Sequence, residues 1–205
     1  MTEDQARRWI IDRFGVSRET RLARLVEAVL QESTRQNLIS PNTVGTIWER
    51  HVVDSAQLLF LAGGRSGEWL DIGTGAGFPG LVIACLRPEP ITLCEPRKRR
   101  TDFLAATADL LGISEQVTVE SCKVERLSGV RSIISARAVA SLDVLFAAGA
   151  AVSDRGTLWL LPKGRSAREE VEAARKTWHG SFHVEQSITD PDSHIVIATD
   201  VRRRR

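Results

Sequence analysis

The sequence predicts an α/β protein with a mostly parallel seven-stranded sheet, a C-terminal antiparallel hairpin and preceding N-terminal helices. Short apolar runs alternate with helical segments after position 67, which is the pattern of βαβ units. A glycine-rich loop follows the first of these runs, at the carboxyl edge where open α/β sheets bind ligands. The last two apolar runs have no helix between them, and they therefore predict an antiparallel hairpin on the same sheet.

The first third of the chain predicts helices. Apolar residues at helical spacing form the stripe of an amphipathic helix that begins near position 17: Leu22, Leu25, Val26, Val29 and Leu30. Pro41 and Asn42 interrupt this helix, and a second one is expected over about 44–62. The glycine-rich loop at 63–67 is the best candidate boundary before the sheet.

The other elements follow in order along the chain. Strands are expected at 68–72, 91–95, 117–121, 132–135, 157–161, 182–187 and 194–198. Helices are expected between them at 79–86, 97–111, 142–151 and 167–178. The chain is thus divided into an N-terminal helical extension packed on the core (1–66), a sheet domain (67–201) and a basic tail (202–205).

Composition excludes several classes of protein. The 205 residues suit one domain, and 28 basic against 26 acidic side chains give a net charge of +2. No apolar run approaches the ~18–20 residues that span a bilayer, and the N-terminus has no apolar signal segment. We therefore expect a cytoplasmic protein with no membrane partner. Three cysteines without a CxxC pair argue against a disulfide framework or a zinc site, and no metal is expected.

The loop after the first predicted strand is the most informative stretch. Glycine occupies alternate positions from Gly73 and Gly75 onward, but Phe78 stands where the dinucleotide fingerprint needs a third glycine, and no Walker A ending is present. Two acidic residues remain: Asp71 before the loop and Glu95 at the end of the next strand. A carboxylate at that strand end can accept both ribose hydroxyls of S-adenosylmethionine, while the loop backbone takes its amino-acid end.

In this feature the sequence resembles the class I methyltransferases, whose first motif reads apolar–Asp/Glu–x–Gly–x–Gly–x–Gly, here residues 70–77. The resemblance implies a Rossmann-like fold and S-adenosylmethionine as cofactor. Enzymes that methylate exocyclic amines usually carry an Asn/Asp-Pro-Pro-aromatic motif after the fourth strand, and this chain has none. Cytosine-C5 enzymes need a thiolate on a loop, whereas the three cysteines here are expected as small apolar packing residues.

Five motifs make the resemblance more specific. They occur in this order: Asn37-Leu38, Trp48-Glu-Arg-His51 with Asp54-Ser55, residues 70–80, Arg137-Ala-Val-Ala-Ser-Leu142, and Leu161-Pro-Lys-Gly164. Together they resemble the bacterial 16S ribosomal RNA guanine-N7 methyltransferases, the RsmG or GidB (glucose-inhibited division protein B) family, over about positions 35–200.

The resemblance implies a role for particular residues. The cofactor would be held by Gly73 and Phe78 in the loop, by the pair Val124 and Glu125 after the third strand, and by Arg137. The implied reaction is methyl transfer from S-adenosylmethionine to N7 of one guanine in small-subunit rRNA. The implied partner is that rRNA or the 30S subunit, and we expect the enzyme to be a monomer.

Guanine N7 bears an in-plane lone pair, so its attack on a sulfonium methyl needs no general base. We therefore expect Arg137 to orient cofactor or guanine without transferring a proton. Candidate RNA contacts are Arg50, His51, Lys163, Arg97 and Lys98. For His51, a packed or capping role is a commoner explanation than an RNA contact. Lys163 fits a solvated surface lysine as well as it fits a phosphate contact.

The sequence departs from the family pattern in the N-terminal helices. Glu32 and Ser33 replace a Trp-Asn pair, and Ile39 replaces a frequent threonine, so substrate contacts there are in question. Two alternatives stay open on the sequence: an unrelated class I methyltransferase acting on a small molecule or protein, and a ribosome-assembly factor with a vestigial cofactor pocket.

Overall fold

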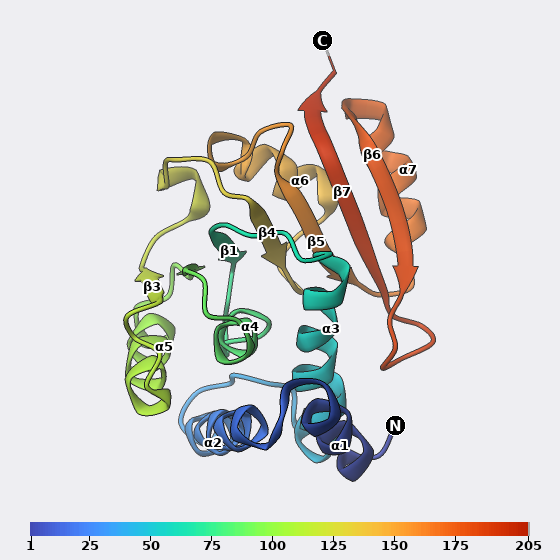
Figure 1. The fold of residues 1–205 in the computed structure, drawn as a ribbon. Coiled ribbons are helices and arrows are strands. Elements are labelled where there is room, and N and C mark those ends of the chain that lie inside the picture. Colours follow the sequence, from blue (N-terminus) through green and yellow to red (C-terminus); the bar gives the residue numbers. More distant parts are fainter. Residues whose placement is uncertain (205) are drawn as a thin grey trace.

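The seven strands form one sheet in the order β3-β2-β1-β4-β5-β7-β6. The computed structural model describes residues 1–204 (Figure 1). The first five strands are parallel, and β7 runs antiparallel to both β5 and β6. The strands are β1 (Trp69–Ile72), β2 (Ile91–Cys94), β3 (Val117–Glu120), β4 (Ile133–Ala136), β5 (Leu158–Lys163), β6 (Trp178–Gln186) and β7 (His194–Arg203). This arrangement confirms the predicted fold class, including the C-terminal hairpin.

Two apolar cores, one on each face of the sheet, hold the layers together. Alternate strand residues point to opposite faces, so Trp69 joins one cluster of buried side chains and Leu70 joins the other. The helices between strands are α4 (Gly80–Leu86), α5 (Lys98–Leu111), α6 (Leu142–Ala148) and α7 (Ala167–Thr177). The cluster containing Trp69 takes in α4 and α5, and the cluster containing Leu70 takes in α6 and α7.

The N-terminal region is helical, as predicted, but is divided differently. It contains α1 (Glu3–Phe14), α2 (Val16–Ser33), the 3-10 helix η1 (Pro41–Thr46), the π-helix η2 (Trp48–Val53) and α3 (Asp54–Leu61). A capping box begins α1, because Thr2 accepts from the amide of Gln5 while the Gln5 side chain accepts from the amide of Thr2. The helical stretch expected over about 44–62 is confirmed, but it is not a regular α-helix throughout, because 3-10 and π-helical turns precede α3.

These helices pack on the same face as α4 and α5. Ile10 of α1 and Leu25 of α2 belong to the buried cluster that contains Leu81 and Leu104. Figure 1 shows α1 and α2 at the opposite end of the molecule from the C-terminus. Within residues 1–204, no helix has both the length and the apolar character required to cross a membrane.

The C-terminal strands are longer than the sequence pattern indicated. β6 already begins at Trp178, where a helix was expected, and β7 continues to Arg203. Arg202 lies opposite His179 in the ladder, so the expected tail is wrong at positions 202 and 203, which belong to the sheet. The backbone hydrogen bonds of the hairpin explain the difference, because they do not depend on apolar side chains. Position 205 of that expected tail lies outside the described residues.

Candidate active site

The glycine loop between β1 and α4 has a backbone that glycine alone adopts easily. Gly73, Gly75 and Gly77 have φ angles of +68°, +60° and +100°. A Cβ atom at Gly73 would lie 2.6 Å from Val139 Cγ2, and one at Gly77 would lie 2.6 Å from Leu81 Cδ1. Gly73 therefore lets the loop pass close to the segment that follows β4, and Gly77 lets it pack against α4.

Asp71 supports this loop from inside the protein. It is fully buried; its Oδ1 accepts from Ser135 Oγ at 2.7 Å and its Oδ2 accepts from the amide of Gly80 at 3.1 Å. Ser135 in turn accepts from Trp69 Nε1 at 2.9 Å. The carboxylate thus joins β1, β4 and the start of α4. Burial raises the pKa of Asp71 to about 6, although hydrogen bonds from Ser135, Thr74 and Gly80 oppose the shift.

This shift predicts a particular pH dependence of stability. An acid whose pKa is higher in the folded state ionises first in the unfolded chain as the pH rises. The free energy of unfolding therefore falls as the pH is raised from about 4 to about 6. We expect the wild-type protein to lose roughly 2 kcal/mol more over this interval than Asp71→Asn, because the full rise in pKa is worth roughly 3 kcal/mol at about 1.4 kcal/mol per pKa unit and part of it falls outside the interval. Urea unfolding at each pH measures the difference. Parallel curves for the two proteins would contradict it.

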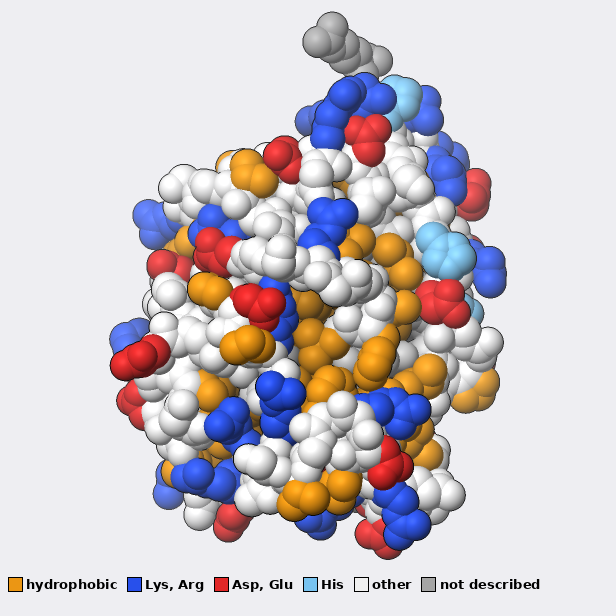
Figure 2. All heavy atoms as spheres, in the orientation of Figure 1, with side chains coloured by type: hydrophobic (Ala, Val, Ile, Leu, Met, Phe, Trp, Pro, Cys, Tyr) orange, Lys and Arg blue, Asp and Glu red, His pale blue; other side chains and the backbone are white. Residues whose placement is uncertain are grey.

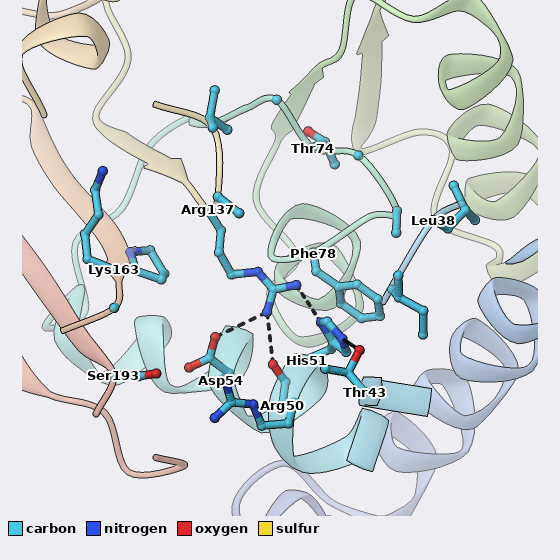
Figure 3. Close-up of a pocket in the computed structure, with 18 of the residues that line it drawn as sticks. Leu38, Thr43, Arg50, His51, Asp54, Thr74, Phe78, Arg137, Lys163 and Ser193 are labelled. Carbon is cyan, nitrogen blue, oxygen red and sulfur yellow. Dashed lines mark hydrogen bonds and ion pairs between the residues drawn. The ribbon is translucent and has the colours of Figure 1, made fainter. Parts of the chain in front are cut away.

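A cavity of about 690 Å³ lies beside the glycine loop (Figure 3). Its wall combines the loop, residues 38–43, η2 with the start of α3, the segment 137–140 after β4, the end of β5 and the start of β7. Most of these chain segments are at the carboxyl edge of the parallel strands, where open α/β sheets bind ligands. Figure 2 shows hydrophobic side chains gathered over the middle of this face, with Lys and Arg around them.

Arg137 makes three hydrogen bonds or ion pairs in this cavity, all with residues of η2 and the start of α3. One guanidinium nitrogen donates to the carbonyl of Arg50 at 3.0 Å and lies 3.3 Å from Asp54 Oδ2; the other lies 2.7 Å from His51 Nδ1. Because a guanidinium only donates, Nδ1 must accept, and the ring proton is on Nε2, which donates to Thr43 Oγ1 at 2.9 Å. The N-terminal helices thus hold Arg137 in place.

His51 is neutral in this arrangement. Burial, together with the charges of Arg137 and Arg50, lowers its pKa to about 3. Its ring is stacked on Phe78, with centroids 4.9 Å apart and planes inclined at 27°. The guanidinium of Arg137 lies over the same Phe78 ring, 5.5 Å from its centroid. The loop aromatic, the histidine and the arginine therefore form one packed unit.

Asp54 ties this unit to the C-terminal hairpin. Its Oδ1 accepts hydrogen bonds from three side chains: Gln57 at 2.9 Å, Ser187 at 3.2 Å and Thr189 at 3.2 Å. Asp54 and Thr43 were not among the predicted site residues. A signal existed for Asp54, because it is part of the motif Trp48-Glu-Arg-His51 with Asp54-Ser55.

The segment after β4 is anchored at its other end by Lys163. Its Nζ is 2.8 Å from Glu170 Oε2 and donates to the carbonyl of Ala140, while Glu170 also accepts from the amide of Leu142 at 3.1 Å. Within the segment, Ala138 has a φ of +55°, which is uncommon without glycine. Lys163 therefore has a structural partner as well as a place on the cavity wall.

The predicted residues are only partly brought together. Gly73, Gly75, Phe78, Arg137, Arg50, His51 and Lys163 all line the cavity. Arg50 is there paired with Asp190. Arg97 and Lys98 lie outside it, exposed at the start of α5. Val124 is buried and Glu125 is exposed, and neither lines the cavity.

Glu95 also lies behind the cavity wall, with only 2% of its surface exposed. Its Oε2 accepts from the amide of Gly75 at 3.1 Å and its Oε1 from the amide of Arg97 at 2.9 Å, while Arg100 lies 3.8 Å away. Each carboxylate oxygen retains a further acceptor position. A carboxylate fixed to the glycine loop in this way fits the ribose hydroxyls of S-adenosylmethionine. Within residues 1–204, no group of three or more His, Cys, Asp or Glu is placed to hold a metal ion.

Solved structures with the same fold are methyltransferases. An O-methyltransferase from Bacillus cereus in complex with SAH is 15% identical, with a TM-score of 0.58 over 85% of this chain and 90% of that one. The ribosomal protein L11 methylase of Lactobacillus delbrueckii subsp. bulgaricus is 14% identical, with a TM-score of 0.58 over 74% and 77%. The chain therefore has the Rossmann-like fold of the class I, S-adenosylmethionine-dependent methyltransferases.

Sequence comparisons identify the family. Residues 18–196 match the GidB family, described as rRNA small subunit methyltransferase G, and the chain belongs to this family. A relative from Rhizorhabdus wittichii is 47% identical over 100% of this chain and 95% of its own length. One from Novosphingobium aromaticivorans is 48% identical over 96% and 88%. Both relatives are called ribosomal RNA small subunit methyltransferase G.

Proposed function

We propose that this methyltransferase modifies small-subunit (16S) ribosomal RNA and that its target atom is N7 of one guanine. The proposed substrate is supported by membership of the GidB family, because the match spans residues 18–196 and the relatives align over nearly their whole length. The choice of N7 rests on the chemistry that the cavity offers.

The cavity side chains around Arg137 suit an acceptor that needs no deprotonation. His51 presents its Nδ1 lone pair to Arg137, and its low pKa makes it a poor base. Asp54 is occupied by Arg137 and by hydroxyl and amide donors, and Glu170 by Lys163. Guanine N7 has a free in-plane lone pair, whereas an exocyclic amine must lose a proton. Alignment and exclusion of water then remain as the catalytic contributions.

Each part of the site has a role in this proposal. S-adenosylmethionine supplies an electrophilic methyl group on its sulfonium. The loop at Gly73, Gly75 and Phe78 would hold its amino-acid end. Glu95, whose carboxylate is fixed to the glycine loop, would hold the ribose. Arg137 orients the reacting groups. The carboxylate of Asp54, which is paired with Arg137, helps to stabilise the positive charge that the guanine ring gains on methylation.

Mapping of N7-methylguanine in 16S rRNA tests the proposal. We expect 16S rRNA from cells that lack the gene to have lost one N7-methylguanine. Purified protein with S-adenosylmethionine should restore this methylation in 30S subunits from these cells or in their deproteinised rRNA. Comparison of these two substrates shows which form is used. Methylation at another atom of the rRNA would contradict the N7 assignment, and no rRNA methylation on either substrate would contradict the substrate.

A further inference from the structure

A basic groove lies beside the active-site cavity. It encloses about 370 Å³ between residues 36–37, which follow α2, and the start of α5. Its lining residues are Gln36, Asn37, Arg97, Lys98, Arg99 and Arg100. Arg100 lines the active-site cavity as well, so the groove and the cavity adjoin at this side chain.

Hydrogen bonds between its two walls fix the shape of the groove. Arg100 donates to the carbonyl of Asn37 at 3.3 Å, and Arg99 donates to the carbonyl of Arg35 at 3.5 Å. In the other direction, Gln36 Nε2 donates to the carbonyl of Arg99 at 3.4 Å. The basic residues of α5 are thus attached to the N-terminal region that also holds Arg137.

The positive charge at the start of α5 is only partly compensated by Glu95, which accepts from the amide of Arg97 at 2.9 Å and lies 3.8 Å from Arg100. Arg97, Lys98 and Arg99 are exposed, and only Lys98 has a carboxylate partner, Asp102, in the part of the chain that the structure describes. The first turn of α5 contains no acidic residue and its N-cap makes no side-chain hydrogen bond. The free amides and the positive end of the helix dipole therefore add to the charge of the side chains.

We propose that the groove binds the sugar–phosphate backbone of the rRNA strand that flanks the target guanine, and that this strand enters the cavity past Arg100. The inference rests on the proposed function. None of the lining residues is aromatic, so the groove offers bases no stacking platform. Its contacts are with phosphates, which position an RNA strand without reading its sequence. Selection of one guanine is left to the cavity.

A triple variant, Arg97→Gln/Lys98→Gln/Arg99→Gln, tests the groove. Binding of a 16S rRNA transcript is measured across a salt titration, with S-adenosylmethionine binding as the check on folding. Each single-strand phosphate contact contributes about 0.7 to the slope of log K against log salt, so we expect the slope to fall by about 2. Affinity at 0.1 M salt should fall roughly 10- to 100-fold. Lys98→Gln alone should lower the slope by about 0.7.

The matched control is Arg155→Gln/Arg175→Gln/Lys176→Gln, which removes three exposed basic residues before β5 and at the end of α7 that line neither the groove nor the cavity. Its slope should equal that of the wild type. An unchanged slope in the groove variant, or the same loss in the control, would overturn the inference. If the wild type binds the transcript through the groove but methylates no rRNA, the proposed function fails and the groove stands. If it methylates rRNA and the groove variant keeps its slope, the groove alone fails.

Discussion

Replacement of Arg137 by alanine is expected to lower kcat/KM for rRNA methylation by roughly 100- to 1000-fold in a protein that still folds. The guanidinium contacts His51, Asp54 and the backbone of Arg50 together. Its loss removes a fixed charge from the cavity and releases the His51 ring that packs on Phe78. Steady-state kinetics with 30S subunits measure the effect, and circular dichroism confirms folding.

Arg137→Lys is the informative companion to this variant. Lysine keeps the charge but cannot reach His51 and Asp54 with a rigid, planar fork. We expect it to recover less than about a tenth of the wild-type rate, because geometry rather than charge positions the reacting groups. Turnover of either variant near the wild-type value would remove Arg137 from the mechanism.

Glu95→Ala is expected to weaken S-adenosylmethionine binding by roughly 100-fold or more, since hydrogen bonds to a charged group contribute about 1.5–3 kcal/mol each. The variant loses the acceptor for the ribose and also the anchor that holds the amides of Gly75 and Arg97. Isothermal titration calorimetry gives the dissociation constant directly.

The matched control is Glu120→Ala. Glu120 is the last residue of β3, and Glu95 comes directly after β2, so the two occupy similar positions at neighbouring strand ends. The side chain of Glu120 is more exposed than that of Glu95 and, within residues 1–204, makes no hydrogen bond with the glycine loop. Its replacement should change cofactor affinity less than threefold or so, on the scale of an exposed substitution. Equal losses in both variants would show that general negative charge, not the position of Glu95, matters.

Much of the sheet could be predicted because its signals are local. Short apolar runs and the turns between them placed the first five strands within one to two residues of their observed ends. The boundaries were poorer where a strand carries polar residues, as in β6 and β7, because backbone pairing across the hairpin extends those strands. In the N-terminal region, the π-helix has no local signal that distinguishes it from an α-helix.

The candidate site was predictable to a smaller extent. The glycine loop and Glu95 could be inferred because they are adjacent to strand ends that a parallel sheet brings to one edge. The partners of Arg137 could not be inferred from the sequence, because His51 and Asp54 are 86 and 83 residues away in the chain. Nor does sequence show that Lys163 is bonded to Glu170, or that Glu95 faces Gly75 behind the cavity wall.

The sequence by itself determined the α/β fold, the glycine loop and the resemblance to the GidB family, since periodicity and short motifs depend on neighbouring residues. Only the tertiary structure decided how the N-terminal helices complete the site. They supply the acceptors that hold Arg137, the ring that packs on Phe78 and one wall of the basic groove. Those contacts join residues far apart in the chain, and their geometry exists only after the helices have packed against the sheet.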